Sequence, residues 1–308
     1  MYLKHFALNK RPFDLTPNTE FSCNYRCHQE ALNTLLFGIC NDEWIIKIIG
    51  EVGFGKTFLC RELLNCLAEP FVVIYLPNPD LSSLELKQAI LRELQSKIPT
   101  DTISDKDLMQ SLFEQLLHCQ QQGKKVIAIV DEAQALPEES LEALRLLTNL
   151  ETESKKLLQL VLFAQPELKQ RLAHDSLRQL NQRITFSLEL TALDCEEVGG
   201  YVERRLIVAG HRDGRLFSRA AQRLLHYASK GIPRLINILA HKAMLAAYGR
   251  GMSKVDRWAV KQAIKDSKDI LPHHSYWSWD KIASLSLFYM WVITIVAIVV
   301  LFLIKYRM

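Results

Sequence analysis

The chain has 308 residues, which is long enough for one large or two small domains with hydrophobic cores of their own. Its 38 Lys and Arg side chains against 34 Asp and Glu leave a formal net charge of +4, which is too small to indicate a nucleic-acid-binding surface by itself. The seven cysteines form an odd, scattered set without a C-x-x-C pair, which argues against a disulfide framework and for a reducing compartment such as the cytosol.

An apolar strand is predicted at residues 44–49, followed directly by a loop with the pattern G-x-x-x-x-G-K-[ST] and a helix at residues 58–67. Glycines let the backbone N–H groups of such a loop surround a phosphate, and the helix N-terminus adds the positive end of its dipole. Lys56 would bring a full charge to the β- and γ-phosphates of ATP, and the Thr57 hydroxyl would bind Mg²⁺. The strand–loop–helix setting disfavours the alternative of an ordinary glycine turn. The candidate ATP-binding residues are Gly50, Glu51, Val52, Gly53, Phe54, Gly55, Lys56 and Thr57.

Strands and helices alternate after this loop. The strands are rich in β-branched and aromatic residues, and Ser104 with Asp107 is similar to a helix capping box. Strands are predicted at residues 71–76, 126–130, 157–163 and 184–190, and helices at residues 83–97 and 105–122. This alternation predicts an α/β domain over residues 44–192 with a parallel sheet covered by helices on both faces. Together with the glycine-rich loop at residues 50–57 it predicts the fold of a P-loop NTPase.

An Asp and a Glu follow the predicted strand at residues 126–130, at the end of the strand where open α/β sheets bind ligands. Asp131 is expected to hold Mg²⁺ through water, and Glu132 to orient or deprotonate the attacking water. An acidic turn without function would be credible only if the phosphate-binding loop were absent.

Four further polar residues gain meaning from their order along the chain. Gln165 follows a predicted strand, where its amide could contact the γ-phosphate or the attacking water. Arg234 begins a predicted helix and is a candidate nucleotide-binding residue. Arg178 and Arg183 lie between them, and either could act on the nucleotide of a neighbouring subunit and stabilise charge on the γ-phosphoryl group. The competing interpretation is that these arginines are solvated or paired with carboxylates.

From residue 194 onward the pattern contains helices only. Asp194 with Glu197 predicts a helix N-terminus, and a Gly-Ile-Pro sequence at residues 231–233 predicts a break before another helix. The predicted helices begin after residues 194 and 218 and span residues 234–248 and 255–266. We therefore expect an all-helical lid subdomain over residues 193–266, followed by a linker over residues 267–284.

Residues 285–304 contain no charge and would span about 30 Å as a helix, the thickness of the hydrocarbon core of a bilayer. Because the segment is apolar all round, a transmembrane helix is favoured over a buried core helix. ATP is cytosolic, so the preceding residues are expected in the cytoplasm. Lys305 and Arg307 also prefer the inner side, but four lysines between residues 261 and 281 favour a single-pass protein with its short end outside.

Several motifs together resemble the ExeA/GspA-type AAA+ ATPases of secretion and pilus systems. They are the loop at residues 50–57, the acidic pair at 131–132, Gln-Pro-Glu-Leu at 165–168, Gly-Ile-Pro-Arg-Leu-Ile-Asn at 231–237, and the N-terminal sequences Arg-Pro-Phe at 11–13 and His-Gln-Glu-Ala-Leu at 28–32. The resemblance covers residues 2–266. Phe54, where the loop usually has a small residue, and Ala164, where a glycine is common, depart from the pattern; a bulky Phe54 side chain can point outward.

This resemblance implies an AAA+ fold, hydrolysis of ATP with Mg²⁺, and homo-oligomers that depend on nucleotide. It also implies that residues 1–43 form a lead-in near the adenine, and that the protein acts at the inner membrane on pilus or secretion components. The same motifs leave two alternatives. A DNA-directed AAA+ ATPase would carry a basic C-terminal module, where this chain has an apolar segment, so nucleic acid is not expected as a partner. The second alternative is a nucleotide switch, which would bind ATP and recruit partners without hydrolysing it.

Overall fold

The structure, a computed structural model, describes residues 1–16, 18–21, 25–77, 80–94, 104–152 and 155–269. Met1–Asp266 form one compact unit. Most of the predicted linker, and the whole of the membrane helix predicted at residues 285–304, lie outside the described residues. Within the described ranges, no helix is both long and apolar enough to cross a bilayer.

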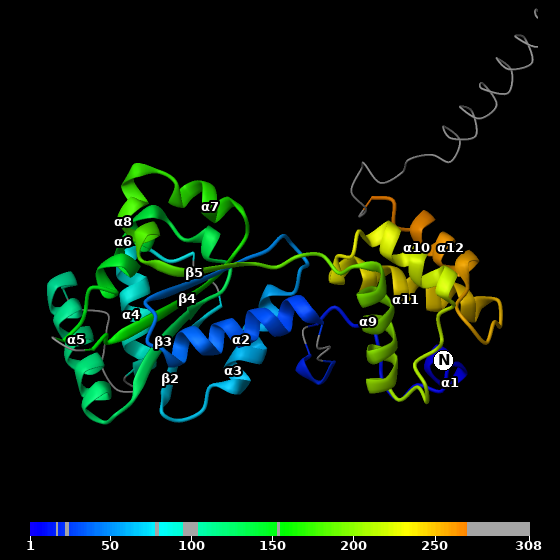
Figure 1. The fold of residues 1–308 in the computed structure, drawn as a ribbon, viewed down its shortest axis with the longest axis horizontal. Coiled ribbons are helices and arrows are strands. Elements are labelled where there is room, and N and C mark those ends of the chain that lie inside the picture. Colours follow the sequence, from blue (N-terminus) through cyan, green and yellow to red (C-terminus); the bar gives the residue numbers. More distant parts are fainter. Residues whose placement is uncertain (17, 22–24, 78–79, 95–103, 153–154, 270–308) are drawn as a thin grey trace, which may run out of the picture. The chain divides into compact units, whose positions relative to one another are not determined.

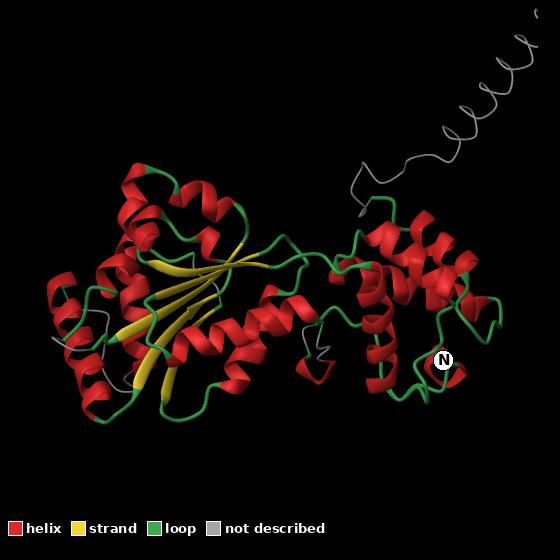
Figure 2. Cartoon of the chain, in the orientation of Figure 1, coloured by secondary structure: helices red, strands yellow, loops and turns green. Residues whose placement is uncertain are grey.

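Five strands of the described residues pair into one parallel sheet (Figure 2). They are almost continuous apolar runs because helices cover both faces of the sheet. The strands are β1 (Ile45–Ile49), β2 (Phe71–Leu76), β3 (Lys125–Val130), β4 (Leu158–Ala164) and β5 (Ile184–Glu189), in the spatial order β2-β3-β4-β1-β5. The five predicted strands and their parallel arrangement are confirmed, with ends that differ by at most one residue.

The two faces of the sheet pack against different helices (Figure 1). Successive side chains of a strand point to opposite faces. Ile46 and Ile48 of β1 therefore belong to one apolar cluster, and Ile45 and Ile49 belong to the other. The first cluster includes α2 (Arg26–Cys40) and α3 (Lys56–Cys66), and the second includes α4 (Ser83–Leu94), α5 (Asp105–Gln121), α6 (Glu138–Leu147), α7 (Glu167–Leu172) and α8 (Arg178–Gln182).

The helix predictions in this layer are confirmed in part. Helix α5 has the predicted start, because the Ser104 side chain accepts the Asp107 N–H. Helix α3 begins at Lys56, two residues before its predicted start, and α4 is described only as far as Leu94. Helices α6, α7 and α8 were not predicted. The periodic signal for α6 was present in the sequence, because its buried leucines recur every three residues, at Leu141, Leu144 and Leu147.

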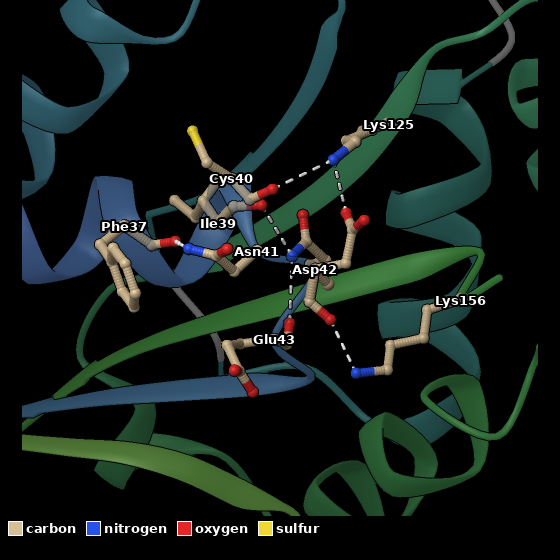
Figure 3. Close-up of polar contacts among 9 residues, drawn as sticks. Phe37, Ile39, Cys40, Asn41, Asp42, Glu43, Lys125 and Lys156 are labelled. Carbon is tan, nitrogen blue, oxygen red and sulfur yellow. Dashed lines mark hydrogen bonds and ion pairs between the residues drawn. The ribbon is translucent and has the colours of Figure 1, made fainter.

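Two lysines hold the turn that leads from α2 into β1 (Figure 3). The Asn41 side chain donates a hydrogen bond of 2.7 Å to the Phe37 carbonyl at the end of α2. Lys125 Nζ, at the start of β3, forms an ion pair of 2.6 Å with Asp42 Oδ1. Lys156 Nζ, just before β4, donates to the Asp42 carbonyl at 2.7 Å. These contacts orient the beginning of β1, whose far end carries the glycine-rich loop.

The chain after β5 is helical, as predicted. The helices are α9 (Cys195–Val208), α10 (Arg219–Ser229), α11 (Pro233–Gly249) and α12 (Arg257–Lys265) (Figure 1). Asp194 and Glu197 form the predicted capping box at the start of α9, and the Ser218 side chain caps α10. Gly231, just before α11, has φ +73°, and a Cβ there would lie 2.0 Å from the Leu193 carbonyl oxygen, so this turn requires glycine.

The N-terminal lead-in packs against these lid helices. It contains α1 (Tyr2–His5) and a short 3-10 helix, η1 (Thr19–Phe21). The Asn9 N–H donates to the Ala209 carbonyl at the end of α9, at 2.8 Å. The ring of Phe13 meets that of Phe217 edge to face, with 5.9 Å between centroids. The lead-in therefore runs along the lid before the chain enters α2.

Candidate active site

The glycine-rich loop joins β1 to α3, as predicted. Gly53 and Gly55 have φ +87° and +88°, a region that side chains with a Cβ rarely adopt. A Cβ on Gly53 would lie 2.8 Å from the Arg234 Cβ, and a Cβ on Gly55 would lie 2.8 Å from His28 Nε2. The tight turn and these close neighbours require glycine at both positions. Phe54 does not point outward: it is half-buried and packs against the apolar cluster of α2 and α3.

Lys56 lies inside the loop and is only 4 % exposed. Its Nζ donates to the carbonyl oxygens of Gly50 and Glu51, at 2.8 and 3.2 Å. Burial lowers the pKa of Lys56, and the negative charges of Glu132 and Asp131 oppose that shift. An anionic phosphate in the loop would likewise favour the charged ammonium group, which is the form that the proposed phosphate contact needs.

Asp131 and Thr57 meet at the carboxyl end of β3. Asp131 is 3 % exposed, and its carboxylate accepts hydrogen bonds from the Thr57 hydroxyl and from the Glu132 N–H, the latter at 3.0 Å. Burial raises the pKa of Asp131, and these two hydrogen bonds oppose the rise. A hydroxyl and a carboxylate beside a phosphate-binding loop fit Mg²⁺, which usually takes few protein ligands and keeps phosphate oxygens and waters. The described residues contain no group of three or more His, Cys, Asp or Glu that could hold a metal ion.

Glu132 is the centre of a small polar network. Its Oε2 accepts hydrogen bonds from Gln134 Nε2 at 2.5 Å and from Gln165 Nε2 at 2.9 Å. The Gln165 N–H donates to Gln134 Oε1 at 2.9 Å, which closes the network. Burial raises the pKa of Glu132, but the hydrogen bonds from the two glutamines and the charge of Lys56 outweigh it, so the pKa lies below its usual value. The carboxylate is therefore ionised and oriented at neutral pH.

Gln134 was missed by sequence reasoning. It lies two residues after the acidic pair, in the 3-10 helix η2 (Ala133–Ala135), and nothing in its spacing distinguishes it from an ordinary turn residue. Glu132 itself has φ +55°, the left-handed region that non-glycine residues seldom adopt. This conformation begins the turn that brings Gln134 back to the carboxylate.

Arg234 connects the lid to the loop. Its backbone N–H donates to the Gly53 carbonyl at 3.2 Å, and its exposed side chain lines a pocket of about 310 Å³. That volume is at the lower end of the range for small-molecule sites. The predicted residues that line the pocket are Val52, Gly53, Gly55, Lys56, Thr57, Glu132, Gln165 and Arg234.

The rest of the pocket wall comes from residues that the sequence did not single out. They belong to the lead-in, to the start of α2 and to the lid helices, and they are far apart in the chain. They include Asp14, Leu15, Thr16, Asn18, Phe21, Tyr25, Tyr201, Arg205 and Asn237. Aromatic and polar side chains of this kind suit a base and a ribose, whereas the loop side suits phosphates.

His28 of α2 lies behind the loop and is 3 % exposed. Its ring meets that of Tyr25 edge to face, with 4.3 Å between centroids, and neither ring nitrogen makes a hydrogen bond to a described residue. Burial lowers the pKa of His28 to about 4, and the nearby carbonyls of Gly55 and Phe54 oppose this shift without reversing it. The ring is therefore neutral at pH 7.

Arg178 and Arg183 do not line the pocket. The Arg183 guanidinium lies 4.4 Å from the centre of the Trp44 ring, and its Nη1 donates to the Thr148 carbonyl at 3.2 Å. Arg178, at the start of α8, is exposed and forms no hydrogen bond or ion pair with a described residue. Neither residue is among those that line the pocket of its own subunit.

Comparison with known proteins supports this assignment of the loop and sheet. Residues 41–172 match a family model described as an AAA domain. A general secretion pathway protein A from Aeromonas hydrophila is 42% identical over 256 residues, which are 83% of this chain and 46% of that protein. The chain thus spans about half the length of this relative.

Solved structures with the same fold are more distant in sequence. The ORC2 protein of Aeropyrum pernix, solved in ADPNP and ADP complexes, matches with a TM-score of 0.61 and 18% identity over 82% of this chain and 72% of that one. CDC6P from Pyrobaculum aerophilum matches with a TM-score of 0.62 and 17% identity, over 80% and 70% of the two chains. RuvB of Thermotoga maritima, a Holliday junction branch migration motor, matches with a TM-score of 0.52 and 16% identity, over 83% and 72%.

These likenesses establish the fold alone, because all three identities are low. The match to the secretion protein is closer and extends beyond the sheet into the lid. The chain therefore contains a P-loop domain of the AAA class and is related to general secretion pathway protein A, as the resemblance to ExeA/GspA-type proteins predicted.

Proposed function

We propose that the chain binds Mg·ATP in this pocket and hydrolyses it to ADP and phosphate. The observation that carries the proposal is the Glu132 carboxylate. It is ionised, accepts hydrogen bonds from Gln134 and Gln165, and has a pKa that the positive charge of Lys56 helps to lower. A carboxylate so placed can orient the attacking water or accept its proton. The amide of Gln165 is the second group that would contact this water or the γ-phosphate.

The remaining residues have positioning and charge-stabilising roles. Lys56, the loop N–H groups and Arg234 would hold the phosphates, and Thr57 with Asp131 would hold Mg²⁺, the latter through water. The metal supplies positive charge that offsets the charge developing on the phosphoryl oxygens. The lead-in (residues 1–43) and the helical lid (193–266) would enclose the base on either side of the loop in the α/β domain (44–192).

A Glu132→Gln variant tests hydrolysis. It keeps the size and the hydrogen-bonding oxygen of the side chain but removes the negative charge, so turnover should fall by about 100-fold or more while ATP still binds. Lys56→Ala is the matched binding variant and should lose affinity for both ATP and ADP. A Glu132→Gln protein that hydrolyses ATP at the parental rate would contradict the proposal. Tight binding without turnover by the unaltered chain, at concentrations where oligomers form, would favour the nucleotide switch instead.

We further propose that the active form is a homo-oligomer in which an arginine of one subunit acts on the nucleotide of the next. Arg178 is exposed and has no hydrogen bond or ion pair with a described residue, as such a contact needs, whereas Arg183 would first have to leave Trp44 and Thr148. Arg178→Ala and Arg183→Ala are distinguished by turnover measured across a range of protein concentration. Specific activity should increase with protein concentration as oligomers form. The arginine that acts on the neighbouring subunit is the one whose replacement by alanine abolishes this increase.

In the cell we propose an assembly factor of the inner membrane, anchored by residues 285–304 with its ATPase domain in the cytoplasm. It would act in the biogenesis of a type IV pilus or a related type II secretion machine. Support comes from the likeness to general secretion pathway protein A. The sequence at residues 75–80 is similar to that of the ATPase of mannose-sensitive haemagglutinin pilus biogenesis, which makes this kind of pilus the first candidate.

Co-purification from detergent-solubilised membranes tests this role. Pilus or secretion components should be recovered with the chain, and their recovery should depend on the nucleotide added. Recovery of the chain in the soluble fraction would contradict the anchor. Salt-sensitive binding of duplex DNA would instead support a DNA-directed ATPase.

A further inference from the structure

Arg205 is a buried cation whose hydrogen-bond acceptors are all uncharged. It lies on α9, is 7 % exposed, and lines the nucleotide pocket. Its Nε donates to the Pro12 carbonyl at 2.6 Å, and its Nη2 donates to the Asp14 carbonyl at 3.4 Å. No described carboxylate forms an ion pair with it. Since both acceptors are lead-in carbonyls, Arg205 ties the lead-in to the lid.

The Tyr201 hydroxyl extends this connection to another lid helix. Tyr201 precedes Arg205 by one turn of α9, and its hydroxyl accepts a hydrogen bond from Arg205 Nη1 at 2.7 Å. The same hydroxyl donates to Asn237 Oδ1 on α11 at 2.9 Å. A hydroxyl can accept and donate at once, so one oxygen links α9 to α11.

Asn237 lies on the helix that reaches the phosphate-binding loop. It follows Arg234 by three residues on α11, so the two side chains share one side of the helix. The Arg234 N–H donates to the Gly53 carbonyl, as described above. Hydrogen bonds and one turn of helix therefore run without a break from the lead-in, at one end of the pocket, to the loop at the other.

We propose that Arg205, Tyr201 and Asn237 form a relay that closes the base end of the nucleotide pocket and fixes α11, and with it Arg234, against the loop. The inference rests on the proposed binding of nucleotide in this pocket. All three line the pocket, and the role proposed for them is positioning, because their hydrogen bonds hold the lead-in, α9 and α11 together. If the pocket wall is closed in only a fraction of the molecules, the apparent dissociation constant of a nucleotide equals its intrinsic dissociation constant divided by that fraction. Binding of ATP and binding of ADP are therefore weakened by the same factor.

Tyr201→Phe is the test, because it removes one oxygen and leaves the ring in place. The dissociation constants of ATP and ADP are measured by calorimetry on the full chain in detergent. Both should rise by about tenfold, the effect expected for loss of a hydrogen bond to a charged group, with their ratio unchanged. Tyr227→Phe is the matched control, because Tyr227 is exposed on α10 and away from the pocket lining, and it should bind as the parent does.

Two further variants keep the proposal falsifiable if Tyr201→Phe destabilises the lid. Arg205→Lys keeps the charge but lacks the planar fork needed to reach both the lead-in and Tyr201, so it should weaken binding like Tyr201→Phe. Asn237→Ala combined with Tyr201→Phe should weaken binding little more than either change alone, because both break the same link.

The outcomes separate the relay from the proposed function. Parental affinity in Tyr201→Phe, or weakened binding of ATP with unchanged binding of ADP, would overturn the relay and leave the nucleotide site intact. Full affinity in Arg205→Lys would also overturn it, because charge alone would then suffice. If the unaltered chain binds neither nucleotide, the proposed function and the relay fail together.

Discussion

The buried histidine behind the phosphate-binding loop makes the stability of this protein depend on pH in a calculable way. His28 is neutral in the folded protein because burial lowers its pKa to about 4, whereas an exposed histidine titrates near 6.5. Between these values the unfolded chain binds the proton more tightly than the folded one. The free energy of unfolding should therefore rise with pH across this window, and the stability due to the neutral ring is lost as the pH falls towards 4.

The size of the effect follows from the two pKa values. The full difference corresponds to roughly 3 kcal/mol, at about 1.4 kcal/mol for each pKa unit. About 2 kcal/mol of it should be lost between about pH 7.5 and about pH 5, since the unfolded state is then almost fully protonated at this site and the folded state is not. That is a large share of the stability of an ordinary domain.

Urea denaturation of the full chain at several pH values measures the effect, with His28→Gln as the comparison because glutamine does not titrate. As the pH falls over this range, the free energy of unfolding of the parent should decrease by about 2 kcal/mol more than that of the variant, since other titrating groups contribute equally to both. His241→Gln is the control, because burial also lowers the pKa of the half-buried His241 ring. This variant should change the dependence of the free energy of unfolding on pH less than His28→Gln does. If His28→Gln and the parent show the same dependence on pH, the ring is either charged or solvated in the folded state, and the reasoning is wrong.

Three other substitutions test particular local features. Gln134→Leu removes one hydrogen bond to the Glu132 carboxylate, so kcat for ATP should fall by about tenfold with little change in nucleotide affinity; steady-state kinetics showing an unaltered kcat would remove Gln134 from the site. Gly231→Ala places a Cβ against the Leu193 carbonyl at a positive φ and should destabilise the lid by more than about 2 kcal/mol in urea denaturation. Gly200→Ala, in the middle of α9 where a Cβ meets nothing within 4 Å, should instead stabilise by about 0.5–1 kcal/mol. Equal stability of these two alanine variants would refute the backbone argument.

Much of the candidate active site was predictable because its residues are tied to local chain geometry. Lys56 and Thr57 follow directly from the spacing of the glycines, and Asp131 and Glu132 follow from the end of an apolar strand. Parallel strands bring their carboxyl ends to the same edge, so the loop, the acidic pair and Gln165 had to lie close together once the strands were identified. The hydrogen bond of 2.9 Å between Gln165 and Glu132 fits this expectation.

The sequence by itself determined the strands, the phosphate-binding loop, the acidic pair and the capped lid helices, because each depends on residues within a few positions of one another. Only the tertiary structure decided the neighbours of these groups: His28 behind Gly55, Gln134 turned back onto Glu132, and the Arg205 guanidinium bound to lead-in carbonyls nearly 200 residues away in the chain. Such contacts form between elements whose separation in sequence carries no periodic signal. They exist because buried polar groups must find partners, and which partner is available depends on how the helices and the sheet pack.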